Sequence, residues 1–292
     1  MQNRDERRQR LLDAVGADGG WPYYAGQAGR IEPTAWALVA LVGIGLDERT
    51  RDRALAFLSG LRREAGLLVD PGAPGANFAW NGLALLALRQ IPHASARELA
   101  GQLASALTAV RGAALEPDHT IRQDNSLRAW SWTPGTFSWV EPTAYCLLAL
   151  KKQPDRSPDV AARIAEADRL LIDRACRPAG WNYGNGAVLD QDLRPYVPTT
   201  ALALLALQDR RREPVVAAGL DWLAANAVTE RSAMALGLAA ICLTVFGRSA
   251  DNPVAALSAS EGLTGFLGNT HLRAMALFSL TLSEHDARAF RI

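Results

Sequence analysis

Six windows of ten residues along the chain are apolar almost throughout and follow one pattern. Two of them read EPTAWALVAL from Glu32 and EPTAYCLLAL from Glu141. The other four begin at Ala79, Pro198, Ser232 and His271. When the windows are aligned without gaps, the fourth and sixth columns hold only small residues and the seventh is always leucine. The tenth column is leucine or isoleucine, so large apolar residues three apart share one stripe of a helix. A helix that is apolar nearly all round is buried on every side, and the pattern therefore predicts six buried helices.

The segments between these windows have a different character, with charges on one face and Leu, Ala or Val at helical spacing on the other. Five of them begin at Arg4, Asp47, Ala94, Ser157 and Glu213, and a weaker sixth spans about 252–261. Window starts recur every 34 to 62 residues, and strand signals are nearly absent. An open stack of helix pairs needs polar capping repeats, yet the last window is as apolar as the others. We therefore expect residues 1–292 to form one all-α domain, a closed (α/α)6 barrel or toroid with six inner and six outer helices.

Composition narrows the class of protein further. The chain has 292 residues, a formal net charge of +1 and interspersed charges, so nothing indicates a nucleic-acid partner. The N-terminus lacks a signal-peptide core, and no apolar run reaches the roughly 18 residues of a membrane span. Cys146, Cys176 and Cys242 are expected to be reduced, buried thiols, which favours a cytoplasmic protein. The sequence does not indicate the oligomeric state.

Inner helices of such a barrel all point the same way, so their N-termini converge at one mouth. The first column of the repeat then brings Glu32, Glu141 and His271 together there. Two long loops, 112–140 and 177–197, feed this end and are rich in Trp and Tyr. Aromatic loops over an apolar wall predict a large hydrophobic ligand in a central cavity.

The chain resembles a known superfamily in its GGW or AGW motifs, each followed by an aromatic loop and then by (E/V)PTAxxLLAL. This arrangement is similar to the prenyltransferase and squalene-oxidase repeat of terpenoid cyclases and protein prenyltransferases. The resemblance implies an α-toroid like that of squalene-hopene cyclase, holding an isoprenoid, with peripheral membrane contact as a further expectation. In class II cyclases of this kind, the middle Asp of an Asp-x-Asp-Asp-Thr-Ala motif protonates the substrate. That position falls on Glu32 or Glu141 here, where the flanking aspartates are missing and Pro33 or Pro142 follows.

Candidate catalytic acids are few, and each has a structural alternative. We favour Glu141, followed by Glu32, although an acid and a proline in the first turn are also ordinary N-terminal helix chemistry. Asp190 and Asp192 could form a shortened proton-donating motif or remain solvated. His271 could donate a proton or simply be a satisfied polar residue at a helix end. Asp118, His119 and Asp124 are polar loop residues with no spacing argument behind them.

Candidate binding residues are mainly aromatic. They are Trp36, Trp80, Trp130, Trp132, Trp139, Tyr145, Tyr183 and Tyr196, with Arg194 and Arg273 for an anionic group. Trp21 and Trp181, each after a glycine, are instead expected to tie outer helices together. No cysteine lies at the predicted mouth, so we expect no metal and no cofactor, except Mg²⁺ if the substrate is a diphosphate.

Three functions remain open at this stage. The first is acid-initiated cyclisation of a polyprenyl substrate by a single-domain terpene cyclase-like enzyme. The second is a non-catalytic toroid that binds lipid or peptide, which the missing aspartates favour. The third, by analogy, is a carbohydrate-active (α/α)6 barrel with paired carboxylates. Two opposed carboxyl groups across an open, wet cleft would favour a sugar, whereas a deep, dry cavity would favour a terpenoid.

Overall fold

The structure is a computed structural model that describes residues 3–63, 65–116, 120, 122–154, 156–285 and 287–292. The inner helices are α2 (Ile31–Val42), α4 (Phe78–Leu88), α6 (Val140–Lys151), α8 (Val197–Ala206), α10 (Ala233–Val245) and α12 (Thr270–Leu280). The outer helices are α1 (Arg4–Asp13), α3 (Glu48–Gly60), α5 (Ala94–Ala109), α7 (Pro158–Asp173), α9 (Pro214–Asn226) and α11 (Asp251–Thr264). Shorter elements are α13 (Leu282–His285), η1 (Gln208–Arg210), η2 (Ala227–Thr229), η3 (Gly265–Gly268), and the hairpin strands β1 (Ala187–Val188) and β2 (Gln191–Asp192).

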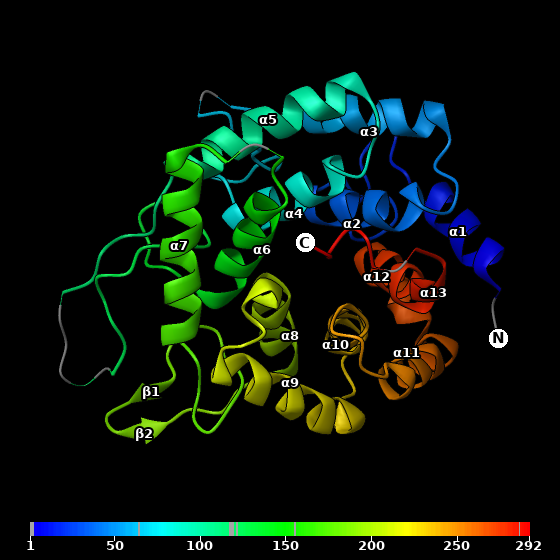
Figure 1. The fold of residues 1–292 in the computed structure, drawn as a ribbon. Coiled ribbons are helices and arrows are strands. Elements are labelled where there is room, and N and C mark those ends of the chain that lie inside the picture. The colour runs from blue at the N-terminus through cyan, green and yellow to red at the C-terminus, as the bar shows by residue number, and fades with distance from the viewer. Residues whose placement is uncertain (1–2, 64, 117–119, 121, 155, 286) are drawn as a thin grey trace.

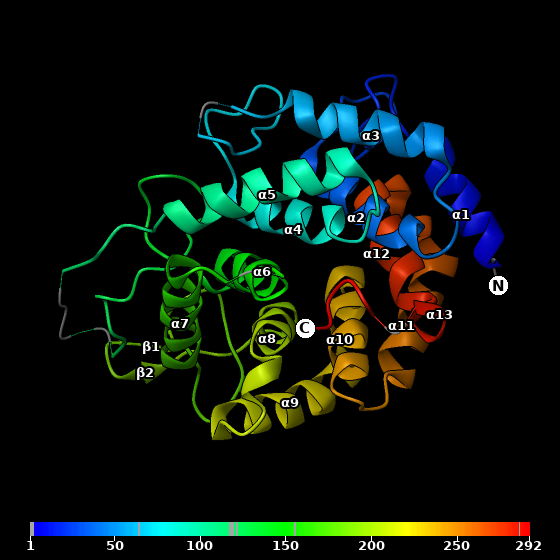
Figure 2. The same cartoon turned by 45° about the horizontal axis from the view of Figure 1, so that its top comes forward.

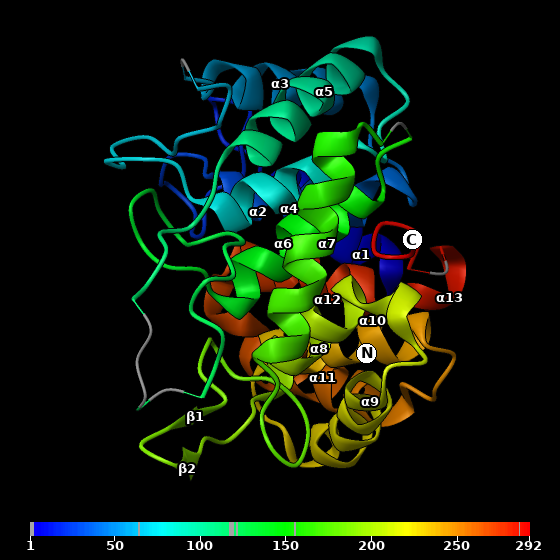
Figure 3. The same cartoon turned by 60° about the vertical axis from the view of Figure 1, so that its left-hand side comes forward.

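The inner helices form a closed ring, which confirms the predicted all-α (α/α)6 toroid. Each inner helix contacts the next, and α12 returns to contact α2. Figures 1 and 2 show the outer helices surrounding this ring, and Figure 3 shows the hairpin of β1 and β2 projecting to one side. None of the helices in the described part of the chain combines the length and hydropathy that a bilayer crossing needs.

Small residues let neighbouring inner helices approach closely. A Cβ atom on Gly82 of α4 would lie 2.8 Å from the backbone nitrogen of Cys146 on α6. A Cβ atom on Gly237 of α10 would lie 2.8 Å from the sulfur of Met275 on α12. Real Cβ atoms do not pack this closely, so the small columns of the repeat set the helix spacing.

Three tryptophans tie the layers together. Trp21, Trp130 and Trp181 are fully buried. The indole N–H of each donates to a carbonyl of the preceding outer helix at 2.6–2.9 Å. The backbone amide of each donates to a threonine hydroxyl in the following inner helix at 2.8–3.3 Å. Trp130, which was expected to contact substrate, therefore has the same structural contacts as the other two, and its side chain is fully buried.

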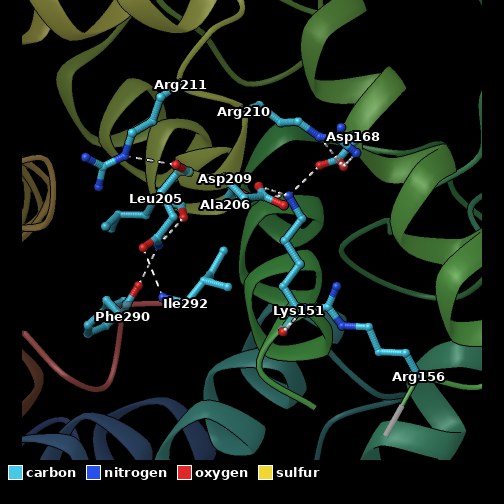
Figure 4. A network of polar contacts seen from close by, with 11 residues as sticks. Lys151, Arg156, Asp168, Leu205, Ala206, Asp209, Arg210, Arg211, Phe290 and Ile292 are labelled. Carbon is cyan, nitrogen blue, oxygen red and sulfur yellow. Dashed lines mark hydrogen bonds and ion pairs between the residues drawn. The ribbon is translucent and has the colours of Figure 1, made fainter. Parts of the chain in front are cut away.

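The C-terminal tail closes the end of the ring opposite the mouth, and Figures 1 and 2 show the terminus near the ring axis. Phe290 is fully buried and stacks on Trp36, with ring centroids 5.4 Å apart. Gln208 fixes the tail by donating to the Phe290 carbonyl at 2.7 Å and accepting from the Ile292 amide at 3.0 Å (Figure 4). An aromatic side chain from the end of the chain thus enters the ring.

A buried ion-pair network lies beside the tail (Figure 4). The Lys151 ammonium, fully buried, donates to Asp168 at 2.6 Å and to Asp209 at 2.5 Å. Its third bond, at 2.9 Å, goes to the carbonyl of Ala206. Arg210 adds a second pair to Asp168 at 2.7 Å. Since every proton of the ammonium has an acceptor, the network joins α6, α7 and η1 without leaving the lysine uncompensated.

Candidate functional site

Loops at the mouth are held over the inner helices by backbone hydrogen bonds. The first amides of α4, α6 and α12 donate to the carbonyls of Trp132, Tyr183 and Tyr23, at 2.9–3.0 Å. The first amide of α2 donates to the Asp70 carboxylate at 2.8 Å. Each aromatic loop is therefore anchored to the neighbouring helix. These four amides are also no longer available to bind a substrate anion.

Glu32 is the first acid of the mouth. The Tyr23 hydroxyl donates a hydrogen bond to the Glu32 carboxylate. Nε2 of His271 lies 3.8 Å from Oε1 of Glu32, which is too far for a hydrogen bond. Burial lowers the pKa of His271, and the Glu32 charge opposes that shift only in part, so the imidazole is neutral near pH 7. Its buried Nε2 has no hydrogen-bond partner among the described residues.

Glu141 is the second acid, and its protonation is unusual. Its side chain is half-buried at the start of α6 and makes no hydrogen bond to the described residues. Burial raises its pKa to about 7, and the negative charge of Glu32 adds to the rise. Tyr145, one turn along, is buried, and its pKa is raised by burial and then by both glutamates. The mouth therefore combines one carboxyl group that is protonated near neutrality with a second carboxylate close by.

Aromatic rings flank these acids at the surface. Phe137 and Trp139 stack with centroids 4.7 Å apart, and Tyr183 and Tyr196 lie 5.4 Å apart. The two tyrosines are 44% and 49% exposed, so their faces are open to a ligand. Burial and the Glu141 charge raise the pKa of Tyr183, which places that ring near the acid. Trp80 and Trp132 are half-buried and pack against the core.

The centre of the ring is filled with side chains, so the expectation of a deep hydrophobic cavity is wrong for the described residues. Trp36 is fully buried between His271 and Phe290, with centroid separations of 6.1 and 5.4 Å. Phe278 packs edge-on against both Trp36 and Phe290. Every residue of α2 from Ala35 to Leu41 is buried, as are the middle turns of the other inner helices. The middle turns of the inner helices, as far as the structure describes them, therefore leave no room for a ligand deep between them.

The remaining predicted site residues lie apart from Glu32 and Glu141. Asp190 and Asp192 are exposed on the hairpin, where Asp192 pairs with Arg122 at 2.6 Å, and Arg194 is also exposed. Arg273 lines a narrow gap beside α1 and α11, close to the Arg7–Glu261 ion pair. Asp118 and His119 lie outside the described residues, and Asp124 is exposed with its pKa lowered by hydrogen bonds from Ser126.

Two residues of the mouth were not assigned a role from the sequence. Tyr23 appears in the motif GGWPYY, and only its neighbour Trp21 gave a specific expectation. Asp70 follows no repeat column, so nothing in the sequence linked it to the start of α2. Within the described residues, no group of three or more His, Cys, Asp or Glu side chains could hold a metal ion.

No known family model and no curated protein matches the chain, whereas solved structures do. An α-amylase from Clostridium perfringens shares 10% identity at a TM-score of 0.70, covering 94% of this chain and 97% of that one. A family 76 glycoside hydrolase from Bacteroides thetaiotaomicron shares 10% identity at 0.63, covering 96% and 76%. The type II terpene cyclase MstE from Scytonema, in complex with geranylgeranyl dihydroxybenzoate, shares 14% identity at 0.60, covering 98% and 96%. The chain has the α/α toroid fold of these enzymes.

The toroid itself does not decide between chemistries. One of these structural neighbours is a glycoside hydrolase and another is a terpene cyclase. Function must therefore be argued from the mouth of this particular chain.

Proposed function

We propose that the protein is a carbohydrate-active enzyme whose acid–base site lies at the mouth of the toroid. Glu141 is the general acid, and Glu32 is the partner carboxylate. The observation that carries the proposal is the pKa of Glu141, raised to about 7 beside a second carboxylate. Pairs of carboxyl groups whose environments separate their protonation states are the usual arrangement for hydrolysis of glycosidic bonds.

The direction of the pKa shift favours this chemistry over protonation of an alkene. A general acid that protonates a glycosidic oxygen works best with a pKa near the operating pH. Protonating a carbon–carbon double bond requires a much stronger acid, whereas burial makes Glu141 a weaker one than an ordinary carboxyl group. Glu141 also lacks the hydrogen-bonding aspartates that increase acidity in the class II cyclase motif.

The shape of the site also supports a sugar ligand. Sugar rings stack on exposed aromatic faces, and the Tyr183–Tyr196 pair offers such faces next to Glu141. Trp36, Phe278 and Phe290 fill the ring, so the described residues leave little apolar space behind the mouth for a folded polyprenyl chain. The α-amylase and family 76 glycoside hydrolase among the structural neighbours are consistent with this proposal.

The test is turnover of a panel of soluble α- and β-linked glycans, measured as new reducing ends. Glu141→Gln keeps the shape of the side chain but cannot donate a proton, and we expect kcat to fall by about 100-fold or more. Glu98→Gln, at an exposed position on α5, is the matched control and should keep full activity. Activity should also decline as pH rises through 7, since Glu141 then loses its proton. Wild-type protein that cleaves no glycan, or Glu141→Gln that cleaves as fast as wild type, would reject the proposal.

A second candidate is the handling of an isoprenoid, for which the stacked rings of Phe137 and Trp139 at the start of α6 offer an apolar surface. MstE, with the same fold, is a type II terpene cyclase. Incubation with geranylgeranyl diphosphate and with squalene, followed by mass spectrometry, would detect turnover. A lipid that co-purifies without turnover would instead indicate the non-catalytic binding toroid. Either result, with no glycan cleavage, would replace the first proposal.

A further inference from the structure

A cavity lies at the opposite end of the ring from the mouth. Its volume is about 350 Å³, and it opens between the C-terminal ends of α2 and α4 and the C-terminal tail. Its polar lining consists of Arg89, Gln90, His285 and Arg288. Among the described residues that line it, none is a carboxylate, and Arg89 and Arg288 bring positive charge.

Arg89 is the unusual member of this lining. Its guanidinium is half-buried, its Nε is buried without a partner, and the side chain makes no hydrogen bond to a described residue. Arg163 and Arg174 are also removed from water, but Arg163 donates to three carbonyls and Arg174 pairs with Asp173. A desolvated guanidinium without an acceptor is costly, because buried charges are normally paired.

The backbone at the end of α4 compensates the positive charge of the Arg89 guanidinium only in part. Arg89 follows the last turn of α4, whose carbonyl end favours a positive charge by about 0.3 to 1 kcal/mol. No carbonyl of that end accepts a hydrogen bond from the guanidinium, however. Burial lowers the pKa of Arg89, with no carboxylate opposing the shift.

Further positive charge surrounds the cavity. Arg288, on the tail, is exposed, and its guanidinium also makes no hydrogen bond to a described residue. Lys152 holds the same tail by donating to the carbonyls of Arg288 and Arg291. The apolar part of the lining includes Val42 and Phe278. Two arginines beside an apolar surface are complementary to an anion that carries a hydrophobic group.

We propose that this cavity binds a small organic anion, a phosphate or carboxylate held by Arg89 and Arg288 with its apolar group against Val42 and Phe278. Its size, near the lower end of small-molecule sites, suits one aromatic ring or short chain with a single charged group. This site is separate from the acids at the mouth and does not depend on their chemistry.

The experiment is isothermal titration of the full chain with phenyl phosphate, benzoate and inorganic phosphate. Phenyl phosphate or benzoate should bind saturably, and the preferred one identifies the charged group. Arg89→Gln and Arg288→Gln should each weaken binding by about tenfold or more, because each removes a charge-assisted hydrogen bond. Arg212→Gln, at an exposed position outside the cavity, is the charge-matched control and should bind like wild type.

A steric variant tests the location without removing charge. Gly43 lines the cavity with an ordinary φ of −81°, and a Cβ atom there would contact Cβ of His285 at 3.5 Å. Gly43→Leu should therefore fold, fill part of the space and weaken binding of phenyl phosphate and benzoate. Circular dichroism checks each variant, and exposed Arg288 carries the charge test if Arg89→Gln does not fold.

Three outcomes would overturn the proposal. One is no saturable binding of any of the three anions up to about 10 mM, a concentration that would detect even very weak sites. Another is equal weakening by Arg212→Gln and Arg288→Gln, which would indicate nonspecific attraction to surface charge. The last is unchanged binding in Gly43→Leu, which would place the anion elsewhere. Because the assay measures binding, its failure is independent of catalysis at the mouth.

Discussion

Replacing Glu141 with Gln should remove a pH dependence from the stability of the protein. The pKa of Glu141 is raised from 4.5 to about 7 in the folded state. Between these values the folded protein holds a proton that the unfolded chain has released. The free energy of unfolding therefore falls as pH rises through this window. The contribution of Glu141 is fully present below pH 4.5 and is lost as pH passes 7.

The magnitude follows from the size of the shift. Each pKa unit corresponds to about 1.4 kcal/mol, so a shift from 4.5 to about 7 corresponds to at most about 3.5 kcal/mol. Because the side chain is only half-buried, water screens part of this effect, and we expect about 1 to 2 kcal/mol. Glutamine is neutral at every pH and should lack this loss.

Urea denaturation of wild type and Glu141→Gln at pH 5 and pH 8 measures the effect. The difference in unfolding free energy between the two pH values should be about 1 to 2 kcal/mol smaller in the variant. Glu98→Gln, exposed on α5, should leave the wild-type difference unchanged. If wild type and Glu141→Gln lose the same stability between pH 5 and pH 8, then Glu141 does not hold a proton near neutrality, and its proposed role as general acid fails.

Three further predictions concern the scaffold. Lys151→Met should lower the unfolding free energy in urea by about 3 kcal/mol, because it leaves the buried Asp168 carboxylate without one of its partners; a loss below about 1 kcal/mol would contradict this. Phe290→Ala should cost about 3 to 5 kcal/mol in the same assay by opening a cavity inside the ring, and unchanged stability would mean that the tail does not fill the ring. Thr143→Val should cost about 1 to 3 kcal/mol, since it removes the hydroxyl that accepts from the Trp130 amide, and an unaltered midpoint of thermal unfolding would argue against this tie.

The fold could be predicted because each repeat carries its own local information. The windows at Glu32 and Glu141 correspond to α2 and α6, which begin one residue earlier. Small columns and a leucine stripe specify a buried helix from short-range pattern alone. Closure of the ring followed from the apolar last window, and α12 indeed contacts α2.

The roles of the tryptophans were only partly predictable, although the spacing between each tryptophan and a following threonine carried information about them. Trp21 precedes Thr34 by 13 residues, and Trp130 precedes Thr143 by the same 13. That spacing links a buried indole to the threonine of the next inner helix. It would have distinguished Trp130 from Trp139, which lies one residue before α6.

The filled centre could not be predicted from the repeats. Phe290 comes from the tail, beyond the last window, and reaches Trp36 through a fold that returns the end of the chain to the ring axis. No periodicity connects residues that are 254 positions apart. Glu32, Glu141 and His271 were correctly expected at the mouth because they share one column, whereas Asp70 required the three-dimensional structure.

The direction of the inner helices bears on the charged groups at their ends, with Glu32 and Glu141 in the first turns of α2 and α6 and Arg89 directly after α4. Their N-termini give the mouth a partial positive charge that favours Glu32 and Glu141, and their C-termini favour Arg89 and Arg288 at the other end. Each helix end contributes only about 0.3 to 1 kcal/mol, which is smaller than the cost of burying a charge. Desolvation therefore dominates at Glu141, whose pKa is raised although a helix N-terminus alone would lower it. At Arg89 the same desolvation opposes the guanidinium charge, and an anion in the cavity would supply the partner that the helix end does not.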